Sequence, residues 1–236
     1  MIFRQLISAD TSTYTFILGC EVTGKAAIID PVIEECERDA KLINELGLTV
    51  THILDTHVHA DHITGGMELK KKFPGATHCY SIHSGVTFTE GLTLVKEGDV
   101  IQIGDTVKIH VLETPGHTDG CITYYLDDKS MVFTGDALFI RGCGRTDFQQ
   151  GSASRLYDSI MKIYSLLPDT CLVYPGHDYK GMLCSTIGEE KKFNPRIFAT
   201  QTREGFVEIM NNLKLAKPRY LDVALPANLV GGVKQQ

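Results

Sequence analysis

Interpretation of this chain starts from one stretch, Thr56-His57-Val58-His59-Ala60-Asp61-His62. Four of these seven residues carry an imidazole or a carboxylate. Without a cation, so many such groups in one short turn would repel and desolvate one another. Neutral imidazoles and carboxylates are preferred ligands of transition metals. The strand-like run at 50–54 leads into the stretch, and its H-x-H-x-D-H pattern predicts a metal-binding loop.

Three further candidate ligands lie later in the chain: His117, Asp136 and His177. Each follows an apolar, β-like run, and a glycine stands directly before each of them. Glycine allows a tight backbone turn at the end of a strand, which would aim the next side chain out of the sheet. One such residue alone would be an ordinary polar loop residue. Three with the same local pattern, downstream of the histidine-rich loop, predict that all seven side chains converge.

Composition and charge narrow the function classes. The chain has 236 residues, of which 43% are hydrophobic and 22% charged, as expected for a globular domain with its own core. The net charge is −6 and no Lys/Arg cluster suggests a phosphate-binding surface, so we expect no nucleic-acid partner. No apolar run approaches the roughly 20 residues of a membrane helix. The N-terminus lacks a secretory signal, so we expect a cytoplasmic protein, or a mitochondrial one if it is a processed eukaryotic chain.

The cysteines indicate a reducing compartment. There are seven, which is an odd number, and no C-x-x-C pair occurs. Such a pattern is typical of reduced thiols packed as small hydrophobic residues. Cys143 differs because it lies in the polar loop around Gly142 and Arg145. A packed thiol is the favoured interpretation for Cys143, and the sequence leaves its role open.

The order of strand-like and helix-like runs predicts the fold class. Short β-rich runs and amphipathic helical runs alternate, with turn residues between them. We expect strands at 2–8, 13–19, 25–30, 50–55, 76–81, 92–95, 99–103, 106–113, 121–126, 131–134 and 171–174. We expect helices at 34–46, 67–73, 152–166, 184–192 and 202–213, a loop at 82–91, and an extended Pro-rich end. This order favours an αββα sandwich, forming a single domain over 1–236 with a short C-terminal extension from about 180.

These residues resemble a known family. The set of seven candidate ligands is similar to that of the metallo-β-lactamase superfamily, whose fold is the αββα sandwich. Four stretches are more specific and resemble the persulfide dioxygenases, also called sulfur dioxygenases: 57–65, 133–151, Asn194-Pro195-Arg196 and Pro226-Ala227-Asn228. The chain departs from the family pattern at Val58 and Gly176, and neither departure removes a candidate ligand.

The resemblance implies an activity and a set of site residues. One non-haem Fe(II) per chain would be held by His57, His117 and Asp136, a facial triad of two imidazoles and a carboxylate. The implied substrates are glutathione persulfide and O₂, and the products are sulfite and glutathione. A homodimer is a further expectation from the family. Four residues would surround the metal ligands without binding this iron: His59, Asp61, His62 and His177.

Three residues match positions that hold glutathione in related families: Arg145, Tyr179 and Arg196. The alternatives are that the two arginines are surface charges or structural ion pairs, and that Tyr179 is a packed core ring.

The second hypothesis is a hydroxyacylglutathione hydrolase, or glyoxalase II, with two metals bridged by Asp136. His57, His59 and His117 would hold one metal, and Asp61, His62 and His177 the other. The loop at 141–151 and the short stretch after His177 favour the dioxygenase, but spacing alone does not settle the number of metals. A third hypothesis is a non-catalytic metal-binding scaffold. The complete set of candidate ligands argues against it.

Overall fold

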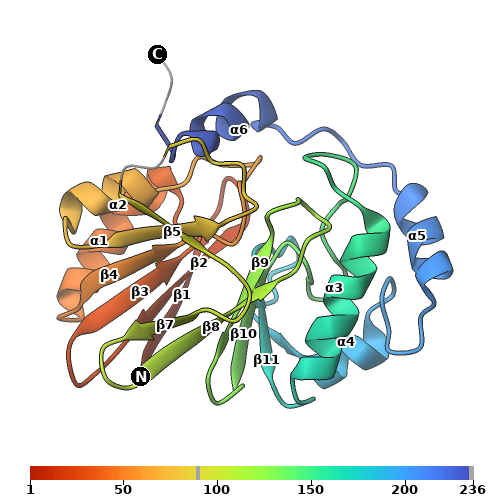
Figure 1. Ribbon diagram of the computed structural model, residues 1–236, viewed down its shortest axis with the longest axis horizontal. Helices are drawn as coiled ribbons and strands as arrows, with labels where there is room; N and C mark the ends of the chain where they lie inside the picture. The colour runs from red at the N-terminus through yellow and green to blue at the C-terminus, as the bar shows by residue number, and fades with distance from the viewer. Residues whose placement is uncertain (89–90, 234–236) are drawn as a thin grey trace.

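The computed structural model describes residues 1–88 and 91–233. Two six-stranded sheets face each other, with helices on both outer sides (Figure 1). The strands are β1 (Ile2–Ser8), β2 (Thr13–Gly19), β3 (Lys25–Ile29), β4 (Thr49–Leu54), β5 (Thr77–Ser81), β6 (Leu92–Val95), β7 (Val100–Ile103), β8 (Val107–Glu113), β9 (Ile122–Leu126), β10 (Met131–Gly135), β11 (Leu172–Pro175) and β12 (Ser185–Thr186). The helices are a 3₁₀ turn (Ile33–Glu35), α1 (Cys36–Glu45), α2 (Gly66–Lys72), α3 (Ala153–Leu166), α4 (Ile187–Phe193), α5 (Arg203–Asn211) and α6 (Leu221–Leu229).

Strand order places the candidate ligands at one end of the sandwich. The first sheet runs β1-β2-β3-β4-β5-β6 and the second β12-β11-β10-β9-β8-β7. Strands β8 and β10 are both antiparallel to β9, and β11 is parallel to β10, so β8, β10 and β11 point the same way. The segments after these three strands carry His117, Asp136 and His177, and the segment after β4 carries the histidine loop. Loops that follow strands pointing the same way meet at one edge, where ligand sites of such sheets form.

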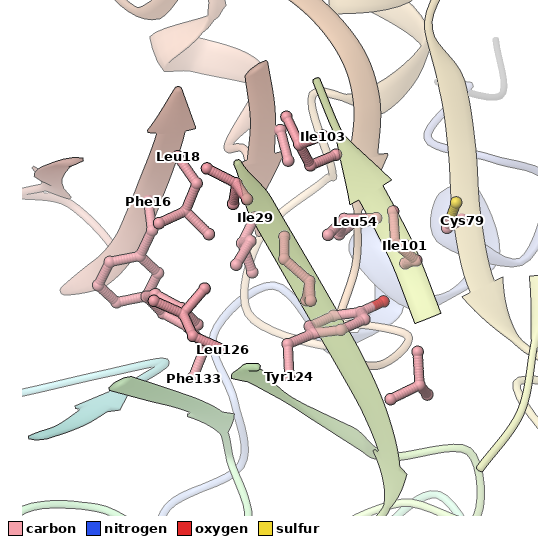
Figure 2. Close-up of a cluster of buried hydrophobic side chains, with 14 of the residues drawn as sticks. Phe16, Leu18, Ile29, Leu54, Cys79, Ile101, Ile103, Tyr124, Leu126 and Phe133 are labelled. Atoms are coloured by element: carbon pink, nitrogen blue, oxygen red, sulfur yellow. The ribbon is translucent and has the colours of Figure 1, made fainter. Parts of the chain in front are cut away.

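Three apolar layers hold the sandwich together. The central layer lies between the sheets and includes Phe16, Ile29, Tyr124 and Phe133 (Figure 2). A second layer joins the first sheet to α1 and α2, and a third joins the second sheet to α3 and α5. The alternation that predicted the strands is visible in β8, whose buried and exposed positions alternate over Val107–Ile109. The αββα sandwich expected from the sequence is therefore confirmed.

The C-terminal end differs from the expectation. The sequence predicts an extended, Pro-rich end, whereas the structure has α6 over Leu221–Leu229 with Pro226 inside it. A proline in a helix removes one backbone hydrogen bond and is unfavourable by about 3 kcal/mol, so the prediction followed local propensity. Helix α6 ends in a Schellman motif, in which the N–H groups of Gly231 and Gly232 donate to the carbonyls of Asn228 and Ala227. The Gly-Gly pair was a stop signal that the sequence interpretation did not use.

The other expected elements are present with small shifts of their ends. Part of the loop expected at 82–91 lies outside the described residues, at 89–90. All seven cysteines are free, and six of them are buried, as the sequence predicted. Across 1–88 and 91–233, no helix combines the length and the apolar character that crossing a bilayer requires.

Candidate metal centre and substrate cavity

The structure brings His57, His117 and Asp136 together. One potential ligand atom from each lies within 4.8 Å of the others, and all three residues are buried. His57 comes from the loop after β4 in the first sheet, whereas His117 and Asp136 follow β8 and β10 in the second. The Nε2 atom of His117 is 3.5 Å from Oδ2 of Asp136. Two imidazoles and one carboxylate thus converge from both sheets.

Each of the two imidazoles is fixed through its other nitrogen. The Nδ1 atom of His117 lies 2.7 Å from the carbonyl oxygen of Arg145, to which it donates. The Nδ1 atom of His57 lies 3.0 Å from Oγ1 of Thr56. That hydroxyl donates to Oδ2 of Asp30 at 2.8 Å, so it accepts from His57. This assignment leaves the Nε2 lone pairs of both rings free, as in metal sites whose ligands are oriented by outer partners.

The donor atoms fit a metal ion. In residues 1–88 and 91–233, Oδ1 of Asp136 and Nε2 of His62 are buried without a hydrogen-bond partner. Buried polar atoms are rarely left unpaired, because the loss of water is not compensated. Burial lowers the pKa of His57 well below its usual range, and the nearby imidazoles of His59 and His117 lower it further. A neutral imidazole is the form that binds a metal.

The remaining four candidate residues form the adjacent part of the site. Ligand atoms of His59, Asp61 and His62 lie within 4.8 Å of one another. His62 Nδ1 is 2.8 Å from Oδ2 of Asp61. The Nε2 atom of His177 is 3.5 Å from the same Asp61 oxygen and 3.6 Å from Oδ1 of Asp136. The structure therefore gathers all seven candidate ligands at one place, in two neighbouring groups: His57, His117 and Asp136, and His59, Asp61 and His62, with His177 close to Asp61 and Asp136.

Two buried carboxylates lie against the Nε2 atom of His59 and affect its pKa. Its Nε2 atom lies 3.2 Å from Oδ1 of Asp30 and 3.4 Å from Oδ1 of Asp55. Burial lowers the pKa of His59, but these two carboxylates outweigh it and hold the pKa well above its usual range. The two carboxylates therefore favour a proton on the Nε2 atom that faces them, whereas Nδ1 of His59 is buried without a hydrogen-bond partner among the described residues.

Glycines let the ligand-bearing turns pack against the histidine loop. Gly135 has φ +48°, and a Cβ atom there would stand 2.5 Å from Oγ1 of Thr56. Gly116 has φ +143°, and its Cβ atom would stand 2.4 Å from the backbone of Leu156. Any other residue at either position would be strained and would collide with its neighbours. The glycine before the ligand is thus required at both turns.

A cavity of about 540 Å³ opens above the seven residues. Four of them line it: Asp61, His117, Asp136 and His177. This volume is typical of pockets that bind small molecules. Its walls come from the loop at 139–145, the turn at 178–180 and the segment at 215–220, which also contributes Arg219 and Tyr220. Four of the seven candidate ligands therefore face a cavity that is large enough for a small molecule.

The three residues predicted to hold glutathione all line this cavity, but they differ in exposure and in the contacts that they already make. Arg145 is already paired: two of its nitrogens lie 2.7 Å from the carboxylate oxygens of Asp147, and a third donates to the carbonyl of Ala216. Arg196 is half-buried, and its Nη1 donates to the carbonyl of Cys143 at 2.9 Å. Tyr179 is 73% exposed and stacks on His177, so it is not a packed core ring.

Cys143 is a packed thiol. It is buried, and its Sγ atom lies 3.5 Å from the sulfur of Met210. Burial raises its pKa to about 11, which keeps the thiol protonated at neutral pH. The burial of Cys143 agrees with the packed thiol that the sequence analysis favoured.

Sequence reasoning missed several residues around the site. Asp30 and Thr56 fix His57, and Lys180 and Arg219 line the cavity mouth. Asp30 had a signal, because it ends the strand expected at 25–30, just as the candidate ligands follow the ends of their strands. Lys180 and Arg219 had none, since only the tertiary fold brings the segment at 215–220 to the cavity.

The fold and the site define a class of protein. The model of the metallo-beta-lactamase superfamily matches residues 9–177, and this chain belongs to that superfamily. Persulfide dioxygenase ETHE1, mitochondrial, of Mus musculus is 46% identical over 234 residues, covering 99% of this chain and 90% of its own length. The crystal structure of ETHE1 from Myxococcus xanthus has a TM-score of 0.92 and 49% identity, and the match covers 99% of this chain and all of that one. Within the superfamily, the chain is a member of the persulfide dioxygenase family.

A hydrolase relative matches less of the chain. The hydroxyacylglutathione hydrolase of Rhodospirillum rubrum is 39% identical over 181 residues, covering 73% of this chain and 65% of that protein. The dioxygenase relatives thus match the C-terminal segment as well as the histidine loop, whereas this hydrolase matches only part of the chain. The resemblance stated from the sequence is confirmed at the level of the family.

Proposed function

We propose that this enzyme is a persulfide dioxygenase that uses one Fe(II) to convert glutathione persulfide, O₂ and water into sulfite and glutathione. The observation that carries the proposal is the buried set of His57, His117 and Asp136, of which His117 and Asp136 line the cavity. Two imidazoles and one carboxylate are typical of non-haem Fe(II) oxygenases, in which the other metal positions stay open. When bound, the iron supplies the path for electrons between the persulfide sulfur and O₂.

The chain's own residues position the ligands. Asp30 and Thr56 hold the ring of His57, and the Arg145 carbonyl holds that of His117, so the Nε2 atoms face Asp136. We assign Arg145 to this task, because its guanidinium is already occupied by Asp147. Burial of the three ligands keeps bulk water away from them and strengthens their attraction for a cation.

The cavity walls suit a substrate with two carboxylates. Arg196, Lys180 and Arg219 are among the cationic side chains that line the cavity, and Arg219 is paired with Asp10. Guanidinium and ammonium groups form charge-assisted hydrogen bonds with carboxylates. We propose that Arg196 binds a glutathione carboxylate and that the exposed ring of Tyr179 packs along the peptide part of glutathione. These contacts would hold the persulfide end over the metal ligands.

His177 is placed to hold a proton beside the reacting sulfur. Its Nδ1 lies 3.2 Å from the carbonyl oxygen of Ser12, to which it donates. Its Nε2 faces Asp61 and Asp136. Burial lowers the pKa of His177, but the two carboxylates outweigh it and raise the pKa above its usual value. We propose that the Nε2–H group of His177 donates a hydrogen bond to the bound anion.

The proposal also covers the cellular compartment and the oligomeric state of the protein. Seven free thiols suit a reducing compartment, so we propose that the protein works in the cytoplasm, or in the mitochondrion of a eukaryote. The homodimer expected from the family is tested by light scattering of the purified protein.

One experiment tests the activity against its alternative. The protein is purified, its metal content per chain is measured, and O₂ uptake is followed after addition of glutathione persulfide. About one iron per chain with rapid O₂ consumption and sulfite release supports the proposal. Two metals per chain, no O₂ uptake and hydrolysis of S-D-lactoylglutathione would identify a hydrolase instead. A protein that binds metal but turns over neither substrate would indicate a scaffold.

A further inference from the structure

The side chain of Asn228 connects the last helix to the metal-binding loop. Its Nδ2 group donates to the carbonyl oxygens of His59 at 2.9 Å and of His62 at 2.8 Å. Its Oδ1 atom accepts from the backbone N–H of Thr64 at 2.9 Å. The side chain is fully buried. Both amide hydrogens and the amide oxygen of Asn228 are therefore used by one short stretch of backbone.

Helix α6 rests on the same loop through apolar contacts. Ile63 of the loop forms a small buried cluster with Ala224 and Ala227 of α6, and Tyr220 packs against it. Beyond the helix, Gly232 has φ +87°, and a Cβ atom there would stand 2.6 Å from the carbonyl oxygen of Thr64. Figure 1 shows α6 across the top of the sandwich, away from α3, α4 and α5. These contacts fasten α6 to the loop.

The segment before α6 forms one wall of the substrate cavity. Leu215, Ala216, Pro218, Arg219 and Tyr220 line it. The Tyr220 hydroxyl donates at 2.8 Å to Oδ2 of Asp10, which also lines the cavity. One continuous stretch therefore touches both the loop that carries His57 and the mouth through which a substrate enters.

We propose that Asn228 is a positioning residue of the metal centre, which fixes the backbone of His59–Thr64 and ties the metal-binding loop to the cavity wall. The inference rests on the proposed metal site. The carbonyls of His59 and His62 would otherwise lie buried without partners, and burying unpaired polar groups is unfavourable. Held in this way, the loop keeps one conformation before the metal binds. This fixed conformation lowers the entropy lost on binding.

The main test replaces Asn228 without changing its shape. Asn228→Asp keeps an acceptor for the Thr64 amide but turns the two donor contacts into contacts between oxygens. The control is Asn194→Asp. Asn194 is also buried and bonds the backbone of Gly142, Arg196 and Ile197 and the carboxylate of Glu190, so this variant too loses donor contacts, but Asn194 does not touch the histidine loop. Both variants should be less stable than the wild type.

The readout is the rate at which a chromophoric chelator removes Fe(II) from the anaerobic holoprotein. Changes to groups that orient ligands typically weaken metal affinity by about 10–100-fold. We expect Asn228→Asp to lose iron about 10–100-fold faster than the wild type, and Asn194→Asp to stay close to it. Equal rates in both variants would overturn the inference. A wild-type chain that binds no metal at all would instead overturn the proposed function.

A second measurement needs no variant and covers the case in which Asn228→Asp does not fold. Amide hydrogen exchange is followed in the wild-type protein with and without Fe(II). We expect Fe(II) to slow exchange in α6 (Leu221–Leu229) as well as in the histidine loop, because Asn228 joins them. Helix α5 (Arg203–Asn211), which has the same length and packs elsewhere, should not change. Protection confined to the loop would show that α6 does not act on the site.

Discussion

Replacing Thr56 by valine tests how the chain prepares its first metal ligand. Valine has nearly the shape of threonine but no hydroxyl. The change leaves Nδ1 of His57 without its acceptor and Oδ2 of Asp30 without its donor, both in buried surroundings. A hydrogen bond to a charged group contributes about 1.5–3 kcal/mol, and an unpaired buried donor costs about 1–3 kcal/mol. We therefore expect a loss of about 3 kcal/mol in the free energy of unfolding.

That loss is measurable by thermal unfolding of the apoprotein. At this chain length about 1 kcal/mol lowers the melting temperature by about 2–4 °C, so Thr56→Val should melt about 6–12 °C below the wild type. Its metal affinity should fall about 10–100-fold, because the His57 ring is no longer oriented. The matched control, Thr56→Ser, keeps the hydroxyl and loses only a methyl group. If valine and serine variants retain metal equally well, the chain His57–Thr56–Asp30 does not prepare the ligand and the reasoning is refuted.

Three further predictions concern other parts of the molecule. Asp136→Ala removes the only carboxylate of the proposed triad, so bound iron and O₂ uptake should disappear together; iron retained at full occupancy would contradict this. Arg196→Ala should raise KM for glutathione persulfide about tenfold with kcat per bound iron unchanged, since a charged hydrogen bond to the substrate is lost. Steady-state O₂ uptake measures both constants, and a lowered kcat with unchanged KM would contradict this role. Burial raises the pKa of Asp39 to about 6, so the folded state binds a proton that the unfolded state releases near pH 4. Wild-type stability should therefore fall by about 2 kcal/mol as pH rises from 4 to 7 through this group, and Asp39→Asn should lack that fall in denaturant titrations.

Periodicity and short-range patterns predicted most of the architecture. Alternating burial in β8 and the strand–glycine–ligand pattern at Gly135 are local properties, and the structure follows them. The contact of Asp30 with Thr56 depends on the pairing of β3 with β4, in which Ile29 lies opposite Leu54. Such a contact needs the sheet register as well as the sequence.

The C-terminal helix shows where local signals fail. Pro226 argues against a helix, and α6 has no strongly apolar face to reveal it. Its stability comes from tertiary contacts with Ile63 and from the three hydrogen bonds of Asn228. The sequence motif around Asn228 is typical of the family. Its hydrogen bonds with the histidine loop, however, depend on the packing of α6 against that loop.

Because His57 follows a strand of one sheet, and His117 and Asp136 follow strands of the other, neither half of the chain alone contains the proposed triad. A partly folded chain with undocked sheets would hold iron only weakly. Metal binding at the proposed site would thus depend on contacts between residues far apart in sequence, which are slow to form during folding. Only molecules that have completed the sandwich would gain the extra stability that tight metal binding provides.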